Sequence, residues 1–471
     1  MRIALAAASA VALVVPLAGA ALADTIEATR SNDTQQGAVA SLDQWEPAQV
    51  VDGSDQARTP TLFSTQRGRA VAVYRVGGAM WASSRAPGAG VPWTQPQQLL
   101  GTPKDSSVGP VATGSDGGAT FFLRGGFGGW AYTHMNATGD FGAVRTFPYQ
   151  DQFPPSGKGL TAALERPNSS LVVAGMTYRQ VKVAVKPPNG PWMMSPGLGL
   201  GYYTVLRGLW QGRNGLVHVL VTQDQQLDSK SSTQDQQVDS TYPSGLYEAV
   251  LHQQNGTLSW GPLRQWRTGM VGGLCETYGC RTRVLSTANG AITVLWQEYS
   301  ATSVKGTVQL MRHRTAAGNW TPVRRMQEPG LPELVASLDD SGTTRLSYIS
   351  GGGDSGSPYE LVTRKLSPDG VLSDPVLVDG PIPHDFFPNL DGVSNPAGAT
   401  LLRWRTNTGT SLEQHIFRCL SGDGCTSVGT FSELGQASMA VTPSRAAFLA
   451  GVDAIPGCPS AKLCSRRLPP P

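Results

Sequence analysis

A short run of apolar, mostly β-branched or aromatic residues recurs along this chain about every fifty residues, and this period limits the fold more than any other feature. The runs begin at Ala70, Ala119, Leu171, Leu216, Ala291, Arg345, Ala399 and Arg445. Only the interval between Leu216 and Ala291 is clearly longer, which predicts an insertion there. A repeat of this length predicts one small structural unit used many times.

Each unit has the same internal order. A polar–apolar strand precedes the apolar run, and two more strands follow it, the last often opened by Trp, as at Trp93 and Trp320. Short β-branched and aromatic runs between turns rich in Gly, Asn and Asp are strand signals, and no capped helical period interrupts them. Four antiparallel strands repeated radially predict an all-β fold, a single β-propeller. We interpret the Trp as a wedge between blades, with a ligand platform as the alternative.

The two ends of the repeat array complement each other. The last unit stops after three strands, whereas residues 44–51, QWEPAQVV, form an orphan fourth strand near the amino terminus. Completing the last blade with this strand removes an unpaired sheet edge. We therefore expect eight blades closed by the amino-terminal strand; seven is the alternative if one weak unit is irregular.

The amino terminus has the pattern of an export signal. Arg2 precedes a continuous apolar run, and Ala21-Leu22-Ala23 is typical of a signal peptidase site, so we expect the mature chain to begin at Asp24. An uncleaved membrane anchor is the alternative; no later segment is apolar enough to span a bilayer. The expected organisation is a signal peptide at 1–23, a flexible leader at 24–40 and a propeller at 41–471 with an insertion at about 222–244.

Charge and composition limit the classes of partner that this chain is expected to bind. Charged residues make up 15% of the chain and the formal net charge is +3, which gives no case for nucleic acid or an anionic membrane surface. Arg far outnumbers Lys, and Ala and Gly are abundant, as is typical of GC-rich bacterial genomes. We expect a secreted, extracellular, monomeric bacterial protein with a glycan or protein ligand.

All six cysteines fall into close pairs. In an exported protein this spacing predicts three short-loop disulfides, Cys275 with Cys280, Cys419 with Cys425, and Cys458 with Cys464. Each lowers the conformational entropy of the unfolded chain by an amount equivalent to at most about 2–3 kcal/mol. The bonds therefore stabilise individual loops and do not hold the fold together. A zinc site is the alternative and requires two pairs to meet.

The insertion contains a short duplication. TQDQQLDS at 222 returns as TQDQQVDS at 233, and the carboxylates of Asp224, Asp228, Asp235 and Asp239 are potential calcium ligands. The duplication lacks an internal Gly for the sharp turn of a calcium loop, which favours a solvated hairpin extension. Calcium remains the alternative, and no other cofactor is expected.

Ligand binding is expected where loops crowd one face of the ring. In a propeller, the loops from strand two to strand three and from strand four to the next strand one share a face. Aromatic rings there, beside amides, carboxylates and guanidinium groups, suit a sugar or a peptide, although structural side chains at blade edges look the same. The candidates are Tyr149, Asp151, Tyr203, Tyr278, Glu298, Asp385, Phe386 and Arg405.

The repeat resembles the blades of secreted sialidase-like and related bacterial β-propellers, and Arg58-Thr59-Pro60 is similar in form and place to the Arg-Ile-Pro triad of sialidases. An intact Asp-box, Ser-x-Asp-x-Gly-x-x-Trp, is absent; the nearest stretches, Ser421 to Cys425 and Ser337 to Ser341, lack Gly at the fifth place. No catalytic residue can be assigned from a motif. The predicted function is a secreted scaffold that binds a carbohydrate or protein; a sialidase-like glycoside hydrolase or lyase is the alternative.

Overall fold

The computed structural model divides the chain into two compact units, Met1–Gly37 and Ala38–Pro471, and all described residues lie in the second. The expected signal peptide and most of the leader lie outside the described residues. The structure describes residues 44–471 except 55, 104, 127–128, 154–158, 178–179, 201–202, 213, 225–244, 269–282, 288–289, 300–306, 327–333, 352–357, 383–387, 396, 408–411, 421–423, 433–436, 453–454, 456 and 460–461.

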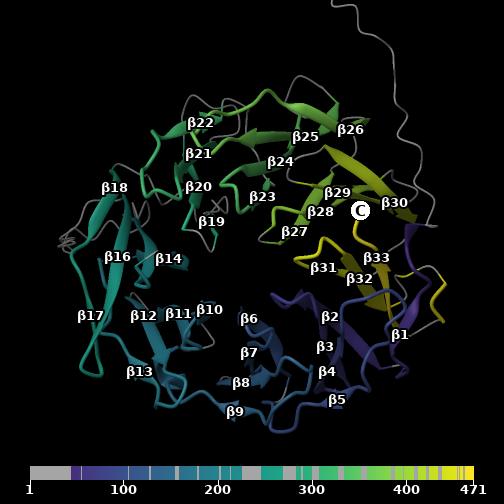
Figure 1. Ribbon diagram of the computed structural model, residues 1–471, viewed down its shortest axis with the longest axis horizontal. Coiled ribbons are helices and arrows are strands. Elements are labelled where there is room, and N and C mark those ends of the chain that lie inside the picture. The colour runs from purple at the N-terminus through teal and green to yellow at the C-terminus, as the bar shows by residue number, and fades with distance from the viewer. Residues whose placement is uncertain are drawn as a thin grey trace, which may run out of the picture. The chain divides into compact units, whose positions relative to one another are not determined.

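The described strands of this unit form eight antiparallel sheets arranged as the blades of a propeller ring (Figure 1). Blade 1 has β2 (Ala57–Ser64), β3 (Ala70–Val76), β4 (Ala79–Arg85) and β5 (Gln97–Gln98), and blade 2 has β6 (Ser107–Thr113), β7 (Ala119–Arg124), β8 (Trp130–Met135) and β9 (Arg145–Thr146). Blade 3 has β10 (Leu160–Glu165), β11 (Leu171–Thr177), β12 (Gln180–Lys186) and β13 (Met193–Met194), and blade 4 has β14 (Tyr203–Gln211), β15 (Val217–Asp224), β16 (Gly245–Gln254), β17 (Thr257–Trp260) and β18 (Arg264–Thr268).

The second half of the ring follows the same order. Blade 5 has β19 (Arg283–Ser286), β20 (Ile292–Tyr299), β21 (Thr307–Arg314) and β22 (Arg324–Met326), and blade 6 has β23 (Leu334–Leu338), β24 (Thr344–Ser350), β25 (Tyr359–Leu366) and β26 (Val376–Ile382). Blade 7 has β27 (Asn389–Ser394), β28 (Thr400–Asn407), β29 (Leu412–Cys419) and β30 (Cys425–Ser432), and blade 8 has β31 (Ala437–Val441), β32 (Ala447–Val452), β33 (Leu463–Leu468) and β1 (Gln49–Asp52). The all-β class, the four-stranded blade and the count of eight are confirmed.

Blade 4 departs from the regular order. Its fourth position is shared, because β17 pairs with the end of β16 while β18 pairs with its beginning, from Gly245 to Glu248. Trp260 therefore ends β17 and does not open a single fourth strand.

The core is divided among the junctions between blades. Eight clusters of buried apolar side chains occur in the described part of the chain, and each joins neighbouring blades. Between blades 1 and 2, for example, Val71 and Val73 of β3 pack with Phe121 and Leu123 of β7. The second strands are the most apolar because they have a paired strand on either side and a neighbouring blade against each face.

The tryptophans near the fourth strands act as wedges, as predicted. Each contacts the blade that precedes its own. The indole N–H groups of Trp93, Trp192 and Trp260 donate to Ser465, Tyr132 and Pro196 respectively, over 2.7, 3.3 and 2.9 Å. The ring centroid of Trp320 lies 4.4 Å from that of Trp266 in blade 4. Their rings therefore pack between neighbouring blades.

The ring is closed by the amino-terminal strand, which confirms that prediction. β1 completes blade 8 by pairing with β33, so that Val50 lies opposite Cys464. Just before β1, the Trp45 side chain is only 4% exposed and its N–H donates to the Val428 carbonyl of blade 7 over 2.6 Å. The same segment therefore completes one blade and packs against another.

A charge cluster strengthens this closure. The Glu46 carboxylate pairs with Arg85 of blade 1 over 2.6 Å and with Arg467 of blade 8. The Arg85 side chain is fully buried and also lies over the Phe448 ring. Burial alone would raise the pKa of Glu46, but hydrogen bonds and charge from the two guanidinium groups outweigh it and lower that pKa.

Two of the three predicted disulfides are confirmed, Cys419–Cys425 and Cys458–Cys464, and no cysteine among the described residues is free. Cys275 and Cys280 lie outside the described residues. So does most of the insertion, because β15 runs to Asp224 and β16 begins at Gly245. Within the described ranges, no helix is long and apolar enough to cross a membrane. No group of three or more His, Cys, Asp or Glu side chains in these ranges is suited to a metal ion.

Candidate functional site

The loop-rich face is the face that carries the strand two–three and strand four–one connections. Five of the eight residues predicted to bind a ligand there are described only by their backbone or not at all. Tyr278, Asp385 and Phe386 lie outside the described residues. Tyr203 is the first residue of β14, and Glu298 lies one residue before the end of β20. Both backbones lie at the strand ends nearest that face.

Tyr149 and Asp151 belong to the connection between blades 2 and 3. The Tyr149 hydroxyl donates to the Trp192 carbonyl over 3.0 Å, and its ring lies edge-on to Phe147 at 6.0 Å. Asp151 is exposed in a short 3-10 turn, Gln150–Gln152. Tyr149 is thus half-buried in packing, while Asp151 is open to solvent.

Arg405 lies near the end of β28 in blade 7. Its Nη2 donates to the Asn389 side chain over 2.5 Å and lies 3.7 Å from Asp391. Asp391 itself binds Arg403 through two guanidinium nitrogens. In the part of the chain that is described, Arg405 makes no contact with Tyr149 or Asp151.

Arg58, from the triad that resembles the sialidase one, lies in β2. Its side chain is exposed, and its Nη1 donates to the adjacent Ala57 carbonyl over 2.9 Å. Its cross-strand neighbour is Arg75, whose Nη2 lies 2.6 Å from Asp105. This brings two guanidinium groups to the loop-rich end of blade 1.

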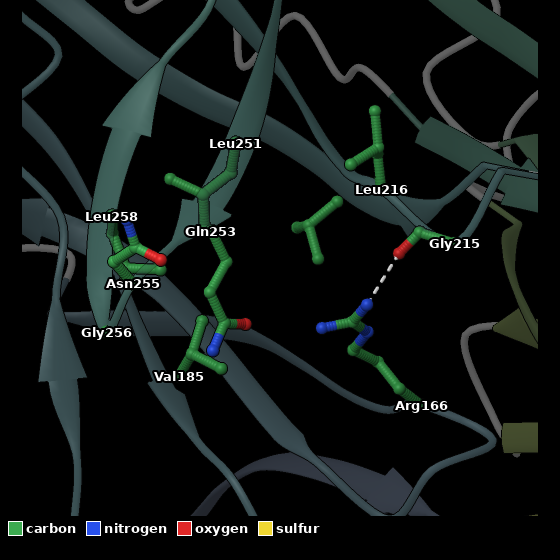
Figure 2. Close-up of a pocket in the computed structure, with 10 residues that line it drawn as sticks. Arg166, Val185, Gly215, Leu216, Leu251, Gln253, Asn255, Gly256 and Leu258 are labelled. Atoms are coloured by element: carbon green, nitrogen blue, oxygen red, sulfur yellow. Dashed lines mark hydrogen bonds between the residues drawn. The ribbon is translucent and has the colours of Figure 1, made fainter.

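A hollow of about 290 Å³ lies on the opposite face, between blades 3 and 4 (Figure 2). We call it the interblade pocket; its lining residues are Arg166, Val185, Gly215, Leu216, Val217, Leu251, Gln253, Asn255, Gly256 and Leu258. Arg166 follows β10, Gly215 and Leu216 precede β15, and Asn255-Gly256 joins β16 to β17. These are strand one–two and three–four turns, so the pocket is not on the face that the sequence analysis favoured.

The pocket has an apolar wall and a polar rim. Val185, Leu251 and Leu258 are buried, whereas Gln253 and Asn255 are exposed. Figure 2 shows the Arg166 guanidinium and the Gln253 carboxamide on opposite sides of the hollow, one from each blade. No carboxylate or imidazole is among the lining residues.

Arg166 is half-buried. Its Nη2 donates to the Gly215 carbonyl over 2.8 Å, while its buried Nε has no hydrogen-bond partner. Burial lowers the pKa of Arg166. Among the described residues, no carboxylate pairs with this guanidinium group.

Two other clusters of titratable groups lie between blades. Between blades 4 and 5, His218 Nδ1 is 2.7 Å from Glu248, which also accepts from the Trp266 indole over 3.0 Å. Burial alone would raise the pKa of Glu248, but these hydrogen bonds outweigh it and lower that pKa. His218 and Glu248 are each less than a tenth exposed, which closes this pair to a polymeric substrate.

The second cluster joins blades 6 and 7 near the loop-rich face. His415 lies 3.5 Å from Asp379 of β26 and 3.5 Å from Glu413 of its own strand. Burial raises the pKa of Asp379, although the nearby imidazole acts in the opposite direction. All three side chains are partly exposed, so this cluster can exchange protons with solvent.

The interblade pocket is not predicted by the sequence, because its lining residues come from the turns and strands of two different blades. The one local signal was Asn255-Gly256, a two-residue hairpin connection in which both residues have positive φ, 48° and 76°. That dipeptide predicts the turn but gives no information about the side chains that face it from blade 3.

Searches of protein families and of curated proteins find no match to this sequence. Solved propeller structures do align with it. A lectin from Burkholderia pseudomallei, BP39L, is 12% identical, covering 79% of this chain and 99% of that chain with a TM-score of 0.47. The polysaccharide lyase Uly1 is 9% identical, covering 90% and 99% with a TM-score of 0.44. A post-proline cleaving enzyme from Rickettsia typhi is 9% identical, covering 83% and 57% with a TM-score of 0.49.

Proposed function

We propose that this protein is a secreted scaffold that binds a carbohydrate in the interblade pocket. The observation that carries the proposal is the composition of that pocket: polar groups of Arg166 and Gln253 face each other across the hollow, aliphatic side chains form part of its wall, and no carboxylate or imidazole is among its described lining residues.

This composition matches a sugar ring. A pyranose presents hydroxyl groups around its edge and C–H groups on its faces. The Gln253 and Asn255 side chains offer amide donors and acceptors, and Leu216 and Leu258 offer apolar surface. The volume of about 290 Å³ lies just below the range of about 300–1,000 Å³ usual for small-molecule pockets. One sugar unit of a longer chain fits such a space.

A protein ligand on the loop-rich face is the other form of this proposal. Exposed Asp151 and the partly exposed guanidinium of Arg405 are on opposite parts of the ring, so such a ligand would contact several blades. Replacing Asp151 and Arg405 with Ala, singly and together, tests this form in a pull-down from the extracellular fraction. Loss of the same captured protein in both single variants is expected if this face binds it.

A glycoside hydrolase or lyase is a second candidate function, favoured by Asp379, His415 and Glu413. An imidazole beside two carboxylates brings together types of side chain that serve as general acids and bases in catalysis. If the protein is an enzyme of this kind, His415→Ala lowers turnover of a fluorogenic glycoside or of an unsaturated-product assay by at least about a hundredfold. Absence of turnover by the unmodified protein removes this candidate.

The binding proposal is tested with a glycan array on the purified chain that begins at Asp24. We expect a limited set of glycans to bind, and Gln253→Leu to weaken them. Gln254→Leu is the matched control, since Gln254 is the exposed neighbour in β16 but does not line the pocket. Binding that is equal in both variants moves the site elsewhere, and an array without signal contradicts carbohydrate recognition.

Export is tested on the same material. Intact-mass analysis of protein from the culture medium should give a chain that starts at Asp24 and lacks six hydrogens, as three disulfides require. A chain that retains residues 1–23, or a thiol alkylated without reduction, contradicts the corresponding part of the proposal.

A further inference from the structure

We infer that the interblade pocket selects an anionic saccharide and that Arg166 binds its carboxylate or sulfate group. This inference rests on the proposed carbohydrate binding and deepens it by naming the class of sugar.

The charge of Arg166 distinguishes it from the paired arginines of the ring. Arg85 and Arg467 share Glu46, Arg75 pairs with Asp105, and Arg403 pairs with Asp391. Arg166 has the Gly215 carbonyl as its hydrogen-bond partner and no carboxylate among the described residues. A half-buried charge without a counter-ion is unfavourable, and an anion in the pocket would remove that cost.

Lack of a counter-ion is not enough by itself, as Arg418 shows. Arg418 is also half-buried, donates to one backbone carbonyl, that of Pro469, and has a buried Nε without a partner. It does not line the interblade pocket, however. Arg166 combines the unmatched charge with an adjoining space that can admit a ligand (Figure 2).

The donors that remain on Arg166 suit an oxyanion. A guanidinium group has five N–H donors in a fixed plane, and the bond to Gly215 uses one of them. Carboxylate and sulfate oxygens accept two such bonds side by side, which makes these charge-assisted contacts strong. None of the described residues that line the pocket is acidic, so none of them repels the anion.

The rest of the pocket favours an anionic sugar over a small inorganic anion. The Gln253 carboxamide faces Arg166 across the hollow, and the aliphatic side chains of Val185, beside Gln253, and Leu216, next to Gly215, also line it (Figure 2). A ring that reaches from the guanidinium to the carboxamide uses both polar groups and covers the aliphatic ones. A phosphate or sulfate ion alone would leave that surface in contact with water.

Titration calorimetry on the mature chain at low salt tests this inference with three tetrasaccharides. The carboxylated probe is tetragalacturonate, the sulfated probe is a carrageenan tetrasaccharide, and the neutral probe is the carboxyl-reduced form of tetragalacturonate. We expect at least one anionic probe to bind about tenfold or more tightly than the neutral one, and its affinity to fall as sodium chloride is raised. The preferred probe identifies which anionic group the pocket takes.

Arg166→Gln should reduce the affinity for that probe about tenfold or more, while the matched Arg418→Gln leaves it unchanged. Thermal melts of both variants monitor folding, and Arg166→Lys, which retains the charge without the planar fork, should fall between Arg166→Gln and the unmodified chain. The comparison between reduced and unreduced probes needs no variant, so it remains decisive if Arg166→Gln does not fold.

The outcomes distinguish selection of an anionic saccharide by Arg166 from carbohydrate binding in general. Equal affinity for neutral and anionic probes, unaffected by Arg166→Gln, overturns the inference but leaves carbohydrate binding in place. Binding of anionic probes that Arg166→Gln and Arg418→Gln weaken equally also overturns it, because the effect is then one of general charge. Absence of binding by every saccharide, on the array and in the calorimeter, contradicts the proposed function as well.

Discussion

Two residues near the amino terminus, Trp45 and Glu46, together make contacts with three blades. Trp45 contacts blade 7 while its own segment continues into blade 8, and Glu46 links blade 8 to blade 1. Neither residue belongs to a regular strand, yet both are nearly enclosed. Substitutions there should therefore affect stability far more than their position near a chain end implies.

Trp45→Ala should lower the free energy of unfolding by about 3–5 kcal/mol, because it empties a site that is 4% exposed and edge-on to Phe431. Urea denaturation followed by fluorescence measures the change. Trp260→Ala is the control, since that indole is partly exposed and should cost clearly less. Equal losses for the two variants would contradict the special role of Trp45.

The ion pairs of Glu46 should make ring closure sensitive to acid. The pKa of this carboxylate is lowered in the folded state, so its contribution to stability is present at neutral pH and is lost as the pH falls through the folded pKa. Glu46→Gln should lower Tm by several degrees at pH 7, and the difference from the unmodified chain should shrink below about pH 4.

Asp105→Asn provides the comparison for that measurement. It removes the pair between Arg75 and Asp105, whose side chains are 34% and 42% exposed. Exposed pairs contribute about 0–1 kcal/mol, so this variant should change Tm little at any pH. A Tm difference for Glu46→Gln that is constant from pH 3 to pH 7 would show that charge is not the reason for its effect.

At the scale of elements, the blade is a unit that tolerates additions at its turns. β15 and β16 pair up to Gln223 opposite Gly245, so the two strands are already aligned at the described residues on either side of 225–244. Replacing these residues with a short Gly-containing turn should keep Tm within a few degrees, because loop length contributes weakly to stability. A Tm that rises with calcium in the unmodified chain, and not after deletion, would favour the calcium alternative.

Elements also explain what the sequence could and could not predict. The second strands and the wedge tryptophans are visible in the sequence because local composition decides their burial, as at Ala70 or Trp93. The interblade pocket is not visible in the sequence. Arg166 and Asn255 lie in turns of different blades, and in the sequence each has the features of an ordinary solvated residue. Only the rotation of one blade against the next brings them to the same hollow.

The predicted binding residues show the same limit. Arg405 is a candidate because of its guanidinium group, but its partners Asn389 and Asp391 come from another strand of the same blade. Tyr149 is a candidate because of its ring, and the ring packs against a neighbouring side chain. A sequence shows which chemical groups are present at a turn, whereas their partners depend on strand pairing.

For the whole molecule, closure of the ring means that every blade packs against a neighbouring blade on both of its faces. The core consists of interblade layers, so an open ring would expose apolar side chains on two blades and leave a strand edge unpaired. The ring is closed by β1, Trp45 and Glu46. Trp45 contacts Val428 and Glu46 pairs with Arg467 across 383 and 421 positions of the chain, whereas Arg85, the other partner of Glu46, is 39 positions away.

Removing that segment tests the architecture directly. A chain that begins at Gly53 lacks β1, so β33 becomes an edge strand, and Arg85 and Arg467 lose the carboxylate they share. Unpaired edges template association between molecules, and a buried charge without its partner is strongly destabilising. We expect this chain to melt at a lower temperature and to form soluble oligomers or aggregates by size-exclusion chromatography with light scattering. A chain that begins at Ser41 retains the closing segment and should behave as the mature protein does. If the chain from Gly53 is monomeric and melts with the chain from Ser41, the amino-terminal strand is dispensable and closure depends on the other interblade contacts.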